Sequence, residues 1–183
     1  MPSIDGTLLT FDLAASTGMA FGHPDQMPQF SSHQFASTGD NFGKHQEQAR
    51  DWIAAALKIH KPVLVGYEQP SIFGKTTPAT TIKLCSYAST LEELCRPRNF
   101  NVRVRQLNPS SMKKYFTDNG KAKKDLMVKR AWDYGFRVIN DDEADAIAAW
   151  FVMVECFGSE AQKQRFHDMR FKAGMGVPSP MVF

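Results

Sequence analysis

Two short apolar runs each end in an acidic residue, and this pattern constrains the fold more than any other feature of the chain. Residues 8–11 are followed by Asp12, and residues 63–67 are followed by Glu68. The second run is almost continuously apolar, as in a central strand covered on both faces of a sheet. A buried carboxylate is costly unless it is paired or binds a cation. The pattern therefore predicts strands that carry acids to a shared cation site.

A third segment adds two more acids to this set. Asp142 and Asp145 open the otherwise apolar stretch 144–152. They are three residues apart, so they share one face of the first turns of a helix. Helix capping explains this pair about equally well, because acids favour a helix N-terminus. Capping does not explain Asp12 or Glu68, so the four acids together predict one divalent-metal site. We expect Asp141 to be the cap residue and Glu143 to face solvent.

The remaining pattern alternates strands and helices. The spacing of apolar residues, with Gly, Pro and Asn at the breaks, predicts strands at 7–12, 18–22, 29–36, 63–68 and 101–107. It predicts helices at 42–60, 78–95, from 109 onward, at 121–134 and at 142–156. Early strands followed by alternating helices and strands indicate an α/β fold with a mixed sheet. We expect one domain over residues 1–158. Residues 159–183 read as a tail that is poorly ordered or binds a partner.

The net charge of the 183-residue chain is only +3, but its bases are concentrated. Residues 103–130 hold nine Lys or Arg and only two acids. Such a block is typical of a polyanion-binding surface, although a lone basic run is more often a solvated helix face. Its position beside an acidic metal site favours nucleic acid. The lysines expected to contact phosphates are Lys113, Lys114, Lys121, Lys123 and Lys124.

Other features set the cellular context. The three cysteines match neither a disulfide framework nor a zinc motif, which favours a reducing cytoplasm. No apolar run is long enough to span a membrane, and the N-terminus does not resemble a signal peptide. Phe73 lies in a loop-like stretch soon after Glu68. It is equally suited to wedge between base pairs at a branch point or to pack in the core.

Four motifs, in order, resemble the RuvC-like Holliday junction resolvases, and especially their phage-type members. Residues 12–20 are similar to the first motif of that family, and residues 67–70 to the second. Residues 108–125 resemble its basic segment, and residues 142–146 its terminal D-x-x-D-A motif. The resemblance extends from about Leu8 to Phe157, which is most of the chain.

The resemblance implies an RNase H-like fold, with a mixed five-stranded sheet and helices on both faces, assembled as a homodimer. It implies two Mg²⁺ ions, replaceable by Mn²⁺, held by Asp12, Glu68, Asp142 and Asp145. Asp12 is our candidate for bridging both ions. The implied activity is hydrolysis of four-way branched DNA to give 5′-phosphate ends. It would serve recombination, repair or phage DNA processing in the cytoplasm of a bacterium or a phage-infected host.

Three other functions remain open at this stage. The chain could be a less selective nuclease for branched or flap DNA, or a ribonuclease of the same fold. It could also be a nucleic-acid-binding scaffold without activity, although a scaffold would be expected to lose the carboxylates, and all four are present. Residues 12–18 also suggest the phosphate loop of an actin-like ATPase. That interpretation needs a second glycine-rich loop and a larger chain, which the sequence lacks.

Overall fold

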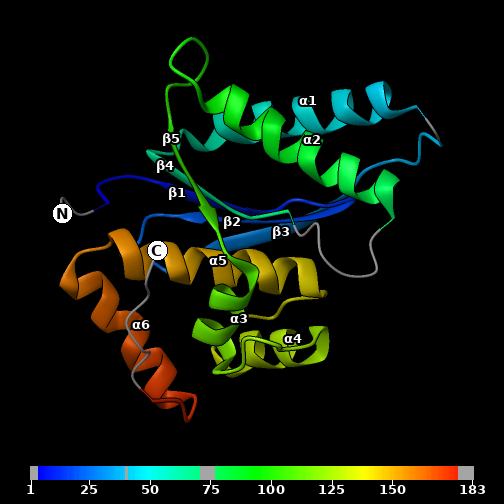
Figure 1. The fold of residues 1–183 in the computed structure, drawn as a ribbon. Helices are drawn as coiled ribbons and strands as arrows, with labels where there is room; N and C mark the ends of the chain where they lie inside the picture. Colours follow the sequence, from blue (N-terminus) through cyan, green and yellow to red (C-terminus); the bar gives the residue numbers. More distant parts are fainter. Residues whose placement is uncertain (1–3, 40, 71–76, 177–183) are drawn as a thin grey trace.

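A five-stranded mixed sheet forms the centre of the molecule (Figure 1). The structure is a computed structural model that describes residues 4–39, 41–70 and 77–176. The strand order is β3-β2-β1-β4-β5. The strands are β1 (Leu8–Asp12), β2 (Ser16–Gly22), β3 (Gln29–Gln34), β4 (Leu64–Glu68) and β5 (Arg103–Leu107). The first three form an antiparallel meander, while β4 lies parallel to β1 and β5 lies parallel to β4. The expected mixed sheet is confirmed.

Helices cover both faces of this sheet, as expected (Figure 1). One face is covered by α1 (Phe42–His60) and α2 (Pro78–Cys95). The other is covered by α5 (Asp141–Phe157), with α3 (Pro109–Thr117), α4 (Lys124–Asp133) and α6 (Glu160–Lys172) packed around it. The sequence patterns predicted the bounds of α1 and α2 correctly, but placed the start of α4 three residues early.

Alternation along the central strands assigns each side chain to one of these two layers. In β1, Leu9 and Phe11 lie in the core beneath α1 and α2, whereas Leu8 lies in the core around α5. The hydroxyl of Thr10 donates to the carbonyl of Ala146 in α5 at 2.8 Å. The even-numbered residues of β1 therefore face α5, and Asp12 continues that series.

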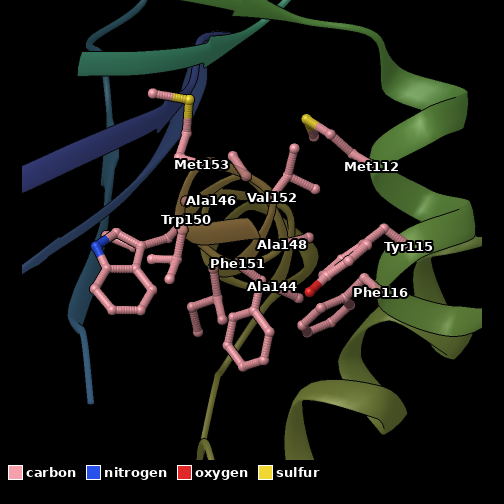
Figure 2. Close-up of a cluster of buried hydrophobic side chains, with 14 of the residues drawn as sticks. Met112, Tyr115, Phe116, Ala144, Ala146, Ala148, Trp150, Phe151, Val152 and Met153 are labelled. Carbon is pink, nitrogen blue, oxygen red and sulfur yellow. The ribbon is translucent and has the colours of Figure 1, made fainter. Parts of the chain in front are cut away.

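The core around α5 is the larger of the two and contains side chains from the strands, from α5 and from α3. Figure 2 shows Met153 pointing from α5 toward the strands, while Tyr115 and Phe116 reach in from α3. Phe151 packs edge-on against Phe116, with ring centroids 5.5 Å apart. Buried aromatic pairs of this kind fix the position of α5 beneath the sheet.

The expectation of a poorly ordered tail from residue 159 is wrong for Glu160–Lys172, which forms helix α6. Ser159 is its N-cap and forms a capping box with Gln162. The apolar pattern did not predict this helix, because few of the side chains of α6 are buried. Phe166 fills the core beside α5. The guanidinium of Arg170, 1% exposed, donates to the carbonyl of Tyr115 and to Asp118. These bonds tie α6 to the end of α3.

Candidate metal and nucleic-acid site

The parallel pairing of β1 and β4 places two acids side by side at one edge of the sheet. Phe11 pairs with Tyr67 in this ladder, and Asp12 and Glu68 are the next residues on each strand. Both belong to the set of side chains that faces α5. The sequence prediction that these two acids share a site is consistent with this geometry.

Close packing of α5 on the sheet brings the other two acids to the same edge. Gly18 pairs with Asp12 in the sheet, and a Cβ atom at Gly18 would lie 1.8 Å from the carbonyl oxygen of Asp142. Any side chain would therefore displace the first turn of α5. At Gly66 a Cβ atom would lie 2.7 Å from the Cγ of Met153, so the helix approaches β4 closely as well. Neither glycine was predicted from the sequence as a site residue.

The first turn of α5 separates the capping role from the candidate ligands. The cap is Asn140, whose side chain accepts from the backbone N–H of Glu143 at 2.9 Å, so the expectation that Asp141 is the cap is wrong. Asp142 accepts a hydrogen bond from the hydroxyl of Ser16. Asp142 and Asp145 are therefore not needed as caps.

Glu143 is also placed differently from the sequence expectation. It is 5% exposed, and its carboxylate accepts from the hydroxyl of Ser32 at 3.1 Å and from the backbone N–H of Ile139 at 3.0 Å. Its role is therefore to join β3 to the loop before α5. The partners are distant in sequence or belong to the backbone, so no sequence pattern could have indicated them.

The four candidate ligands are close enough to perturb one another. Burial raises the pKa of Asp12 well above its usual value, and the charges of Glu68, Asp145 and Asp142 raise it further. The pKa of Asp145 is raised to about 7, first by burial and then by the charge of Glu68. Burial also raises the pKa of Glu68 and of Asp142. Accumulated negative charge in a low-dielectric site favours either protonation or a bound cation.

Two buried oxygen atoms bear on whether a cation would fit the site. Glu68 Oε2 and Asp145 Oδ1 are buried, and neither has a hydrogen-bond partner among the described residues. Unpaired buried oxygens are rare in proteins, and hard oxygen ligands are those that Mg²⁺ prefers. Within the described ranges, no three acidic, imidazole or thiol groups are drawn together into a ready coordination shell. The carboxylate ligands and the two unpaired oxygens fit a divalent cation. The carboxylates would have to move closer together to coordinate it.

The basic block divides into two groups. The charge of Lys113 opposes the rise in the pKa of both Glu68 and Asp145, which indicates that Lys113 lies near these acids. Lys124 forms an ion pair with Asp141, Nζ to Oδ2, at 2.5 Å. The other three lysines are exposed, and none forms an ion pair with a described residue: Lys114, Lys121 and Lys123. Phe73 lies outside the described residues.

Comparison with known proteins identifies the fold. No family model matches the chain, and no curated protein matches its sequence. RuvC from Thermus thermophilus superimposes with a TM-score of 0.57 at 14% identity, covering 94% of this chain and 99% of that one. The same protein in complex with a Holliday junction substrate gives 0.61 at 12% identity, covering 96% and 100%. The yeast mitochondrial Holliday junction resolvase gives 0.57 at 17% identity, covering 94% and 86%. The chain has the RNase H-like fold of these RuvC-type proteins.

Proposed function

We propose that this protein is a metal-dependent endonuclease that cleaves four-way branched DNA. The observation that carries the proposal is the pair of orphaned oxygens, Glu68 Oε2 and Asp145 Oδ1, in a cluster of carboxylates beside Lys113. Buried acids alone would repel DNA. Acids that hold cations, flanked by lysines, would bind it.

The proposed ligands are the four carboxylates already described, and the proposed cofactor is Mg²⁺, two ions for each site. Bound by these carboxylates, the ions would supply activation of a water and stabilisation of the leaving 3′ oxygen, so that the product would carry a 5′-phosphate. Asp12 is the proposed shared ligand, because the central strand holds it most rigidly between Glu68 and the first turn of α5. Ser16 orients Asp142 through its hydroxyl group.

The lysines divide the work of binding the substrate. Lys113 is proposed to contact the phosphate next to the scissile bond, and the action of its charge on Glu68 and Asp145 supports this role. The exposed lysines of the loop before α4, among them Lys121 and Lys123, bind phosphates farther along the strand. Phosphate contacts of this kind position a strand without reading its sequence.

The proposed substrate follows from the fold together with the site. Among the solved structures of the same fold, the yeast mitochondrial protein is named a Holliday junction resolvase, and Thermus thermophilus RuvC is described in complex with a Holliday junction substrate. Resolving a four-way junction requires two nicks in strands related by symmetry, which a two-fold dimer supplies directly. The outer side of α2 exposes Ile82, Cys85 and Ser89, which carry no charge and would suit such a contact. We therefore propose a homodimer. None of the described helices is long and apolar enough to cross a membrane.

The test is a cleavage panel with Mg²⁺, Mn²⁺ or EDTA. Four-way junctions, flaps, linear duplexes, single strands and RNA–DNA hybrids, all built from the same sequences, are compared, and product ends are identified by ligation. We expect Mg²⁺-dependent, paired nicks in the junction. Comparable cleavage of flaps would indicate a less selective nuclease, and cleavage only of hybrids would indicate a ribonuclease. Binding of DNA without any cleavage would leave the scaffold as the better description.

A further inference from the structure

An exposed apolar corner lies beside the candidate site, and neither the fold nor the metal chemistry requires it. Ile139 is 83% exposed and Trp132 is 51% exposed. Single exposed apolar residues are common, but these two are adjacent, because the indole N–H of Trp132 donates to the carbonyl of Val138 at 3.0 Å. The corner therefore presents an aromatic and a branched aliphatic side chain together.

The chain around this corner is held rigidly. The backbone N–H of Ile139 donates to the buried carboxylate of Glu143, which also accepts from Ser32. Asn140 caps α5 and donates from its side-chain amide to the hydroxyl of Ser32 at 2.9 Å. A buried acid and two further polar side chains thus fix the loop that exposes Ile139. Preorganised presentation of an apolar side chain to solvent is a feature of binding surfaces.

A cation completes the corner. Residues 136–139 alternate, with Phe136 and Val138 buried and Arg137 and Ile139 exposed, so the last two share the outward side. Arg137 forms no ion pair with any residue that the structure describes. An unpaired guanidinium on the same side as an exposed apolar side chain matches a nucleotide, which offers a phosphate and an apolar base or sugar face.

The position of the corner indicates which nucleotides of the DNA it would contact. Ile139 is three residues before Asp142, so their Cα atoms are at most about 11 Å apart. A side chain so close to the candidate ligands would meet DNA held there. In a continuous duplex the base faces are stacked and inaccessible, whereas at a branch point they are partly open.

We propose that Trp132, Arg137 and Ile139 form a contact surface for the branch point, in which Arg137 binds a phosphate and the two apolar side chains pack on unstacked bases. This inference rests on the proposed function. It adds a selectivity surface on the α4–α5 side of the site.

The experiment compares Ile139→Ser with Ile59→Ser. Ile59 is 71% exposed at the C-terminal end of α1, so the two variants replace the same side chain at two well-exposed positions. Binding is measured in Ca²⁺, with a four-way junction and a linear duplex of the same arm sequence. We expect Ile139→Ser to weaken junction binding about tenfold, which corresponds to about 1.4 kcal/mol, and to change duplex binding less than twofold. Ile59→Ser should match the wild type on both.

Trp132 gives an independent readout. Trp150 is buried and Trp52 is half-buried, so the described tryptophan most open to DNA is Trp132. Junction DNA should quench the emission of the wild type, and Trp132→Phe should lose most of that response.

Three outcomes would overturn the inference. Junction binding by Ile139→Ser equal to the wild type, with wild-type cleavage intact, would reject this surface while leaving the proposed nuclease standing. A change in molecular mass with unchanged DNA affinity would assign the corner to a protein contact. Failure of the wild type to bind or cleave any junction would reject the proposed function, and the inference with it.

Discussion

The two faces of the sheet carry different kinds of side chain. Toward α1 and α2 the layer is aromatic: Phe11 and Phe35 pack against Trp52, Tyr87 packs against Phe35, and Tyr67 lies in the same core. Toward α5 the sheet carries small residues at its points of closest approach: Gly18 lies against the first turn of the helix, and Gly66 lies against Met153. Large side chains hold helices away from a sheet, whereas small ones let backbones approach closely.

This difference explains where the acids can gather. Only a helix that lies close to the sheet can place its own carboxylates beside those at the strand ends. On the aromatic side, Glu92 is held by the hydroxyl of Tyr67 and takes no part in the cluster. The small-residue face is therefore the one that can assemble a metal site, at the cost of accumulating buried negative charge.

The largest expected effect comes from removing one charge on the small-residue face. Asp12→Asn should abolish cleavage, by about 10³-fold or more, because the central ligand of the proposed two-metal site loses its charge with little change of shape. Binding to junctions should survive. Glu92→Gln is the matched control, since it makes the same kind of acid-to-amide change on the aromatic side. Initial rates in Mg²⁺ decide the matter, and normal turnover by a folded Asp12→Asn protein would sink the assignment of the site.

The close approach of α5 can be broken directly. Gly18→Ala places a Cβ atom only 1.8 Å from the carbonyl oxygen of Asp142, so the first turn of α5 must move. We expect stability to fall by about 1–3 kcal/mol and cleavage to fall steeply. Gly66→Ala meets side chains, Met153 at 2.7 Å and Thr10 at 3.1 Å, but no backbone atom, so it should be milder. Gly43→Ala in α1 meets its nearest neighbour at 3.6 Å and serves as the control in thermal melts and cleavage assays.

The lysines on the two sides of the sheet provide a third test. Changing Lys121, Lys123 and Lys124 to Ala should weaken binding to every DNA substrate. The slope of log affinity against log salt should become shallower by roughly one for each of these lysines that binds a phosphate. The corresponding triple change of Lys44, Lys58 and Lys61, all exposed on the α1 side, should leave the slope unchanged. Equal slopes for the two triple variants would show that the block near the site faces only solvent.

The smallest expected effect concerns stability without metal. The pKa of Asp145 is about 7 in the folded protein and about 3.9 in an unfolded chain, so the folded state holds more protons between these values. Stability from this group is therefore full below about pH 4 and falls as the pH rises toward 7. In EDTA at pH 8, Asp145→Asn should melt a few degrees above the wild type, and Mg²⁺ should reduce the difference. Melting of this variant below the wild type in EDTA would contradict the repulsion.

Elements with strong local signals were predicted well. Helix α1 ends where Lys61-Pro62 breaks the pattern, and α2 begins at Pro78, so both ranges follow from nearby residues. Helix α6 was missed because only Gln162, Phe166 and Arg170 of its 13 residues are buried, too few to give a periodic signal. Glu143 was misplaced because its partners, Ser32 and the N–H of Ile139, come from outside its own helix.

The sequence by itself determined the candidate ligands and the mixed sheet. Both depend on short-range regularities: an acid after an apolar run, two acids three residues apart, and strands that alternate with helices along the chain. Tertiary structure alone decided that α5 lies close enough to complete the site, through Gly18 and the hydroxyl of Thr10. Close approach depends on which residues meet across the fold, and a single sequence records each residue without its distant neighbour.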